Sequence, residues 1–477
     1  MSENTISVMR GRICLPQGNG VTGVMHRVRI AIIGSVAAMG IASAGLAQEA
    51  ESGPATPAEA AEARADNAPD DVTSEFDQAF AQEEQDEPEL PSWPVEHAQA
   101  LLDAIEGIGV EGLDPSDYEP EELRAAISRG EGPVLDEAAA TSFTWLVEDL
   151  RDGRTPMAAR KQWFVVDPDA DRMPTDWLMK TALFSGDIAG TLAGLHPETP
   201  DYQVLKQALA AADPANTKQV EMIRANMDRW RWLPRNLGTQ YLLTNVPEYQ
   251  LRLTVNDKII RTYRTIVGKP GRTATPQLAE LVEGVIFNPT WTVPQSIVKG
   301  EGLGQRALNN PAWARSQGYK VTQGENGWIS VVQQPGPTNS LGVMKLDMPN
   351  PHAIFFHDTP NRNLFNTANR AYSHGCIRTE RALELAMTIA ILGQGATKEE
   401  AIEISTSGEY TRVPVKKTMP VYIAYFTMGS DIEGNLRAFP DIYGRDAPVL
   451  ASFDAPRVRD RARVTNEEVV PIEAPGA

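Results

Sequence analysis

Cys376 is the residue in this sequence best placed to do chemistry. It is one of two cysteines in 477 residues, and it follows a histidine and a glycine in the stretch YSHGCIRTE. A thiol attacks as the thiolate, so a nucleophilic cysteine needs a base within hydrogen-bond reach or a positive field. His374 projects on the same face as Cys376 if this stretch is extended, and His357 ends the apolar run AIFF. These residues indicate a nucleophilic thiol with one of two histidines as its base. A buried structural cysteine is the alternative.

The surroundings of the cysteine favour the nucleophile over a metal ligand. Gly375 lets the backbone approach closely, and a helix expected to begin near Thr379 would direct its positive end toward the thiol. The other interpretation is a zinc site formed by His352, His357, His374 and Cys376. The sequence has no Cys-x-x-Cys pair and no His-Glu-x-x-His helix to support it. We therefore predict neither a metal nor a cofactor.

The N-terminus has the composition of an export signal. A basic stretch begins at Met25, an alternative start, and leads into an apolar run that ends in small residues at Ala47. This order predicts a secretory signal over residues 1–47, cleaved after Ala47. A retained membrane anchor is the alternative, although the apolar run is short for a span of about 20 residues. Cleavage would remove Cys14 and leave Cys376 without an intramolecular disulfide partner.

The formal net charge of −19 makes an electrostatic nucleic-acid partner unfavourable. Much of this charge lies in residues 48–90, where Arg64 is the sole basic residue among many Asp and Glu. Such a composition predicts a disordered acidic linker, with a docking tail as the alternative. Residues 454–477 are also predicted to be a disordered tail.

Two periodicities predict the elements that must position the thiol. Over residues 91–225, apolar side chains recur at three- and four-residue steps, which predicts an all-helical module. From about 236 to 453, short alternating runs broken by Pro and Gly predict a β-rich domain, with a hairpin turn at Asn256-Asp257. Residues 296–335 interrupt this domain with a polar, partly helical stretch that is long for a connection. We interpret the chain as an α+β multidomain protein in which this insertion covers a site.

The stretch HDTPNRNLFNTANRAYSHGCIR resembles the signature of the L,D-transpeptidases, in which a histidine is followed after about fifteen residues by Ser-His-Gly-Cys. Here residues 358–372 separate His357 from Ser373. The stretches MDRWRWLPRNLG, NVPEYQLRL, VGKPGR, FNPTWTVPQSIV, MPNPHAIFFHDTP and VPVKKTMPVYIAYF resemble large periplasmic members of this family in the same order. The resemblance covers residues 91 to about 453. Many large relatives carry a small helical peptidoglycan-binding module before the catalytic domain, whereas residues 190–225 of this sequence leave no room for one there.

The resemblance implies a β-sandwich-like catalytic domain of the YkuD type, a helical scaffold domain before it, and a capping insertion over 296–335. It further implies that Cys376 is the acyl-accepting nucleophile and His357 its base, with Asp358 orienting that base through its main-chain carbonyl. His374 and Gly375 would shape the oxyanion side of the site.

Four further residues are predicted to contact the substrate. Arg378 suits a substrate carboxylate because a guanidinium pairs with that group in a fork, and a surface salt bridge is the alternative. Trp291 is expected to line the donor channel unless it packs into the core. Tyr372 and Ser373, beside the thiol, complete the set.

The implied activity is a two-step acyl transfer in the periplasm. A tetrapeptide stem would acylate Cys376 and lose its terminal D-alanine, and diaminopimelate of a second stem would accept the acyl group in a 3→3 cross-link. Resemblance also implies acylation by carbapenems. Alternatives are an L,D-carboxypeptidase with water as acceptor, an enzyme that anchors a lipoprotein lysine, an amidase, and a non-catalytic wall-binding scaffold protein. Peptidoglycan stem peptides are the expected partners, with the membrane close by if the leader is retained. The oligomeric state is not predicted.

Overall fold

The structure is a computed structural model that describes residues 90–469. The predicted signal over 1–47, the acidic linker up to residue 89 and the last eight residues of the predicted tail lie outside the described residues. Within the described part of the chain, no helix is both long and apolar enough to cross a membrane.

Residues 91–231 are helical, which confirms the predicted helical region. Its α-helices are α2 (Val95–Glu106), α3 (Pro120–Arg129), α4 (Pro133–Asp152), α5 (Asp169–Arg172), α6 (Thr175–Ser185), α7 (Ile188–Ala193), α8 (Pro200–Ala211) and α9 (Thr217–Arg231). Helices α3, α4 and α8 begin with proline, whose fixed φ and missing N–H suit the first helical turn. Trp93, Phe143 and Leu146 are fully buried in the core of this region. The apolar spacing noted in the sequence therefore forms the interior.

A mixed sheet of nine strands follows the helical region. The strands are β1 (Gln240–Asn245), β2 (Gln250–Val255), β3 (Lys258–Gly268), β4 (Leu278–Phe287), β8 (Met344–Asp347), β9 (Phe356–His357), β10 (Ala371–Ser373), β11 (Ile377–Thr379) and β12 (Thr411–Ala424). Their order is β10-β3-β11-β9-β8-β4-β12-β1-β2, and β2 also pairs with β3. The sheet therefore closes on itself, and the fold class is α+β with several domains, as predicted.

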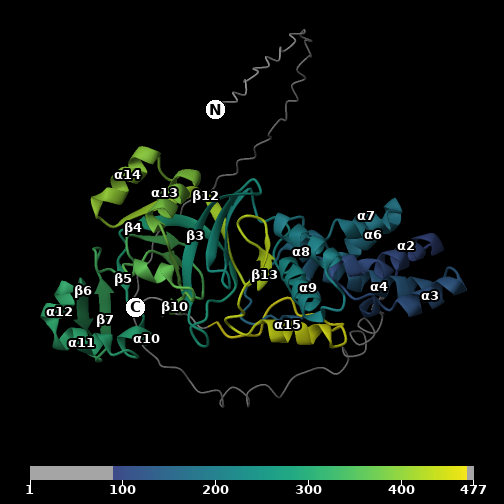
Figure 1. The fold of residues 1–477 in the computed structure, drawn as a ribbon, viewed down its shortest axis with the longest axis horizontal. Helices are drawn as coiled ribbons and strands as arrows, with labels where there is room; N and C mark the ends of the chain where they lie inside the picture. The colour runs from purple at the N-terminus through teal and green to yellow at the C-terminus, as the bar shows by residue number, and fades with distance from the viewer. Residues whose placement is uncertain (1–89, 470–477) are drawn as a thin grey trace, which may run out of the picture. The chain divides into compact units, whose positions relative to one another are not determined.

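The closed sheet surrounds one apolar core and is covered by helices. The predicted hairpin turn is present, since Val255 pairs with Lys258, and Asn256 and Asp257 both have positive φ. Helix α13 (Ala382–Leu392) packs against the sheet through buried apolar side chains, and α14 (Lys398–Ser407) follows it. Figure 1 shows both helices beside β4 and β12. The short pair β13 (Met428–Ser430) and β14 (Leu436–Ala438) and helix α15 (Asp446–Phe453) complete the domain.

The structure corrects the predicted helix start beside the cysteine. Residues Ile377–Thr379 form strand β11, and α13 begins only at Ala382. The hydrogen bonds of β11 to β3 and β9 outcompete helix formation at these positions. Cys376 is therefore followed directly by a strand and not by a helix terminus.

The insertion forms a small subdomain, which we call the cap (residues 291–333). It contains β5 (Trp291–Thr292), α10 (Gln295–Val298), α11 (Leu303–Asn309), α12 (Pro311–Ser316), β6 (Tyr319–Gln323) and β7 (Ile329–Gln333). Its strands pair in the order β5-β7-β6, separate from the large sheet. Val293, Val298 and Val331 form a core of its own, and Figure 1 shows its helices grouped around β6 and β7.

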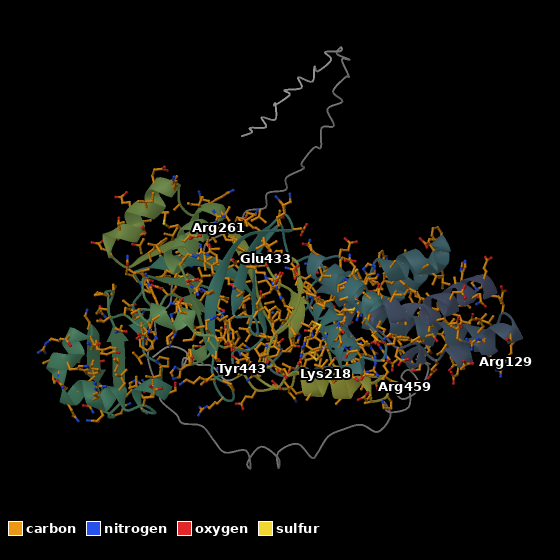
Figure 2. The ribbon with its side chains drawn as sticks, viewed as in Figure 1. Arg129, Lys218, Arg261, Glu433, Tyr443 and Arg459 are labelled. Atoms are coloured by element: carbon orange, nitrogen blue, oxygen red, sulfur yellow. The ribbon has the colours of Figure 1, made fainter. Side chains whose placement is uncertain are left out.

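The predicted disordered tail is wrong for residues 454–469, which lie against the helical region. Arg457 donates to both carboxylate oxygens of fully buried Asp149 at 3.0 Å, and Arg461 donates to the same carboxylate at 2.6 Å. Arg459 stacks on the ring of Trp145 and is labelled in Figure 2. A buried carboxylate needs such partners, and they come from a segment that looked unstructured because it buries little apolar surface.

Candidate active site

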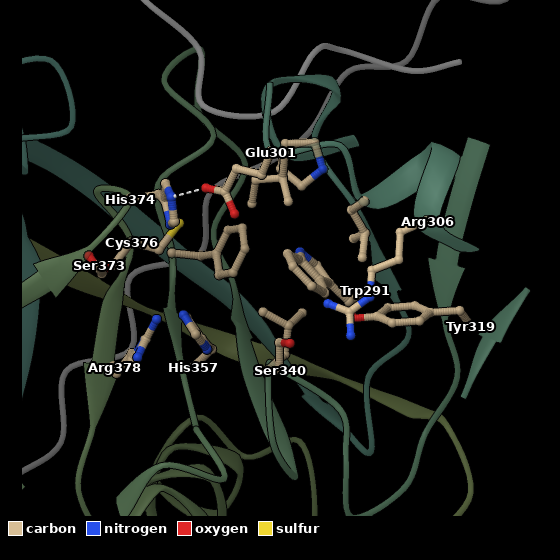
Figure 3. A pocket seen from close by; sticks show the side chains of 15 residues that line it. Trp291, Glu301, Arg306, Tyr319, Ser340, His357, Ser373, His374, Cys376 and Arg378 are labelled. Carbon is tan, nitrogen blue, oxygen red and sulfur yellow. Dashed lines mark hydrogen bonds and ion pairs between the residues drawn. The ribbon is translucent and has the colours of Figure 1, made fainter. Parts of the chain in front are cut away.

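A cavity of about 350 Å³ lies between the closed sheet and the cap. The sheet side contributes Phe355, His357, Ser373, His374, Cys376 and Arg378. The cap side contributes Trp291, Ile297, Glu301, Leu303, Arg306 and Tyr319. Figure 3 shows these two groups of side chains facing the same space. The fold therefore brings the predicted thiol and both candidate bases to one pocket.

His357 is held as a neutral imidazole by its strand and by Asp358. Strand β9 lies between β8 and β11, and the imidazole of His357 is only 6 % exposed. Its Nδ1 lies 2.5 Å from the main-chain carbonyl oxygen of Asp358. Because a carbonyl can only accept, Nδ1 carries the proton and Nε2 keeps its lone pair. Burial, helped by the positive charge of Arg378, lowers the pKa of His357 to about 3.

The carboxylate of Asp358 has a structural task. It is buried and accepts hydrogen bonds from the N–H of Val343 at 3.0 Å and from Arg362 at 3.1 Å. Gly342 has φ +64, and a Cβ there would lie 2.2 Å from this carboxylate. Only glycine fits this close approach. The main chain of Asp358 is thus fixed, and through it the orientation of His357.

Hydrogen bonds from Ser373 and Thr275 fix the loop of residues 373–376, which carries the thiol. The hydroxyl of Ser373 donates to the carbonyl of Cys376 at 2.6 Å and accepts from the N–H of Gly375 at 3.0 Å. Gly375 has φ +123, a conformation that favours glycine. Thr275 donates to the carbonyl of Gly375 at 2.7 Å. Sγ of Cys376, which is half-buried, lies 3.5 Å from the carbonyl oxygen of Ala353.

Arg378 supplies the positive charge at this site. It is the register partner of His357 in the parallel pair of β11 and β9, so the two side chains lie next to each other, as Figure 3 shows. Burial lowers the pKa of Arg378, and the charge of Cys376 acts in the opposite direction. The same attraction favours the ionised thiol. Within the described residues, Nε of Arg378 is buried without a hydrogen-bond partner.

His374 points toward the cap. Its Nε2 lies 2.8 Å from Oε1 of Glu301, and both side chains are partly exposed. Figure 3 places this pair on one side of Cys376, with His357 and Arg378 on the other. The two candidate bases therefore have different surroundings: His357 is a buried neutral imidazole, and His374 is paired with a carboxylate.

Of the remaining residues considered in the sequence, Trp291 lines the pocket, whereas Tyr372 and His352 do not. Trp291 lines the pocket and also packs against both the main core and the cap core. Tyr372 lies on β10 and is not among the pocket-lining residues. His352 is buried against the ring of Phe164, with 4.1 Å between ring centroids, and burial lowers its pKa. Among residues 90–469, no group of three or more His, Cys, Asp or Glu is arranged to hold a metal.

Sequence reasoning missed Glu301, Arg306 and Thr275. Glu301 and Arg306 fall inside the stretch interpreted as an insertion, and their charges could have suggested contact with a polar ligand. Thr275 lies about 100 residues before the glycine it supports. A contact of that separation leaves no local signal.

Comparison with known proteins identifies two matching families. Residues 239–423 match the L,D-transpeptidase catalytic domain, YkuD, and residues 91–209 match the Scaffold domain. A candidate L,D-transpeptidase of Haemophilus influenzae is 26 % identical over 373 residues, which are 74 % of each chain.

Solved L,D-transpeptidases are more distant. The enzyme from Mycobacterium smegmatis matches 39 % of this chain and 58 % of its own length, at 13 % identity and a TM-score of 0.19. The Enterococcus faecium enzyme matches 40 % of this chain and 52 % of its own length, at 14 % identity and a TM-score of 0.20. The chain thus spans little more than half of these two structures.

Proposed function

The chain belongs to the L,D-transpeptidase family, with the catalytic domain behind a Scaffold domain, and from this premise we propose that it forms 3→3 cross-links between peptidoglycan stems. The acyl group would be carried as a thioester on Cys376. One observation carries the proposal: Cys376, the neutral imidazole of His357 and the buried guanidinium of Arg378 line the same pocket.

In the first half-reaction, Sγ of Cys376 attacks the carbonyl of the diamino acid at the third stem position. Nε2 of His357 takes the thiol proton and then gives it to the amine of the departing D-alanine. An imidazole with a pKa near 3 is a weak base, so proton transfer accompanies the formation of the C–S bond instead of preceding it. Arg378 stabilises negative charge on sulfur, and its guanidinium, which lines the pocket, suits a stem carboxylate.

In the second half-reaction, the side-chain amine of diaminopimelate in another stem attacks the thioester. The C–N bond forms, the C–S bond breaks, and the thiol is restored. The cap is placed to limit the access of water, because it forms one wall of the cavity. Release by water would give an L,D-carboxypeptidase, and release by a lysine would anchor a lipoprotein. The predicted leader would place this chemistry in the periplasm.

The direct test uses the chain from Gln48 onward with disaccharide tetrapeptides and analysis of the products by mass spectrometry. We expect cross-linked dimers from the native protein, none from Cys376→Ala, and a strongly reduced yield from His357→Gln. The matched control is His97→Gln in α2, which lies outside the pocket. Tripeptides without dimers would instead indicate an L,D-carboxypeptidase.

A second readout separates acyl transfer from mere wall binding. A carbapenem should acylate Cys376, seen as an increase in intact mass that is absent in Cys376→Ala and slower in His357→Gln. A protein that binds muropeptides but shows neither turnover nor a mass increase would be a non-catalytic scaffold, and the proposal would fall.

A further inference from the structure

Glu301 has a position in the pocket that the first half-reaction does not use. It lies in the cap between α10 and α11. Among the described residues that line the cavity, Glu301 is the one with an acidic side chain. Its carboxylate is 2.8 Å from Nε2 of His374, two residues before the nucleophile, and its side chain is 56 % exposed. The carboxylate is therefore close to the thiol loop and still open to a ligand.

The charges that line the cavity indicate which class of ligand the carboxylate of Glu301 binds. Arg306 and Arg378 also line the cavity, and both are cations that repel a positively charged molecule. A basic primary amine is protonated at neutral pH, so it must be attracted as an ammonium ion and then lose a proton before it can attack. Glu301 is the group that can do both, with His374 beside it to share the proton.

We propose that Glu301, paired with His374, binds the ammonium group of the acceptor and accepts its proton. This assignment rests on the proposed function and names its acceptor class: a basic primary amine, not water and not a neutral nucleophile.

The proton balance of this step is complete. The ammonium ion gives one proton to the carboxylate of Glu301, which passes it through His374 to solvent. The neutral nitrogen then attacks the thioester carbonyl, the C–N bond forms, and the C–S bond breaks with its electron pair on sulfur. The second amine proton moves through His357 to the sulfur, which restores the thiol. This half-reaction releases one proton, the amine of the D-alanine that leaves in the first half-reaction takes one up at neutral pH, and no other co-reactant is needed.

In this arrangement His357, on one side of the thiol, serves both half-reactions, whereas Glu301, on the other side, acts in the second half-reaction only. His357 is buried and fixed through the main chain of Asp358, on the side that Figure 3 shows opposite the Glu301–His374 pair. Glu301 belongs to the cap, which has its own core. A substitution at Glu301 should therefore change the resolving step and leave acylation intact.

The test compares two acceptors in Glu301→Gln, which keeps the size of the side chain but removes its charge. The basic acceptor is the tetrapeptide muropeptide itself, and the neutral one is hydroxylamine, which is largely unprotonated at neutral pH. The matched control is Glu325→Gln, an exposed cap residue outside the cavity. Products are quantified by mass spectrometry, and acylation by a carbapenem checks that the variant is folded.

In Glu301→Gln, cross-linking should fall on the order of tenfold to a hundredfold, as expected for loss of a charge-assisted hydrogen bond. The hydroxylamine product and carbapenem acylation should stay within about twofold of the native protein, and Glu325→Gln should match the native protein throughout. Undiminished cross-linking, or an equal loss with both acceptors, would overturn the role of Glu301 but not the proposed function. If the native protein makes no cross-links, the proposed function falls together with it.

Discussion

Replacing His357 by glutamine should change how the stability of the protein depends on pH. In the folded protein, burial and Arg378 lower the pKa of His357 from 6.5 to about 3. In the unfolded chain, the imidazole takes up a proton as the pH falls below 6.5. The unfolded state therefore binds more protons than the native state between pH 6.5 and about pH 3, and the native state loses stability as the pH falls.

The size of this effect is set by the two pKa values. Each pH unit in this window costs about 1.4 kcal/mol of unfolding free energy, and the whole window costs about 5 kcal/mol. Lowering the pH from about 7.5 to about 4.5 crosses roughly two units of the window, so His357 should account for about 3 kcal/mol of lost stability. His357→Gln removes the titrating group, while its amide N–H can still donate to the carbonyl of Asp358.

The assay is urea unfolding of the native protein and His357→Gln at several pH values. The difference in unfolding free energy should shift in favour of the variant by about 3 kcal/mol at the lower pH. Phe356→Leu serves as the control, because it removes buried packing and no titrating group. Its cost should be the same at each pH. Parallel pH profiles for the native protein and His357→Gln would refute the idea that a buried neutral imidazole is present.

Three other substitutions test further parts of the site and the fold. Gly342→Ala should destabilise the protein by about 1–3 kcal/mol in thermal or urea unfolding and slow acylation, because its Cβ would lie 2.2 Å from the carboxylate of Asp358; native-like values would contradict this packing. Arg378→Gln should slow thiol alkylation at neutral pH on the order of tenfold, and an unchanged rate would remove Arg378 as the source of the field. Asp149→Ala should cost about 3–5 kcal/mol in urea unfolding because the guanidinium groups of Arg457 and Arg461 both lose this buried carboxylate as a partner; a loss below about 1 kcal/mol would mean that residues 454–469 are only loosely attached.

The local sequence was sufficient to predict features that depend on neighbouring residues, such as helices, strands and turns. The change of apolar period from helical to alternating separated the helical region from the sheet, because burial of one face imposes that period on the chain. Asn256 and Asp257 indicated a turn because they tolerate the positive φ values found there. The family resemblance implied that Asp358 orients His357 through its carbonyl, and the structure has that hydrogen bond.

Features that depend on distant partners were missed or mistaken. Thr379 was expected to begin a helix, but pairing of β11 with β3 and β9 makes it part of a strand. Residues 454–469 were expected to be disordered because their composition is polar, whereas Arg457 and Arg461 bind a carboxylate more than 300 positions earlier. Neither the strand at Thr379 nor the ordered segment 454–469 can be predicted without knowing which distant segments they contact.

By itself, the sequence predicted Cys376 as the nucleophile and His357 as its base, and it determined the class of each domain. These properties depend on residue type and periodicity, which any fold must respect. Only the tertiary structure decided that the sheet closes on itself, that Arg378 rather than a helix end supplies the positive charge, and that Glu301 reaches His374 from the cap. Those outcomes depend on which segments pack together, and electrostatic fields act across space irrespective of position in the chain.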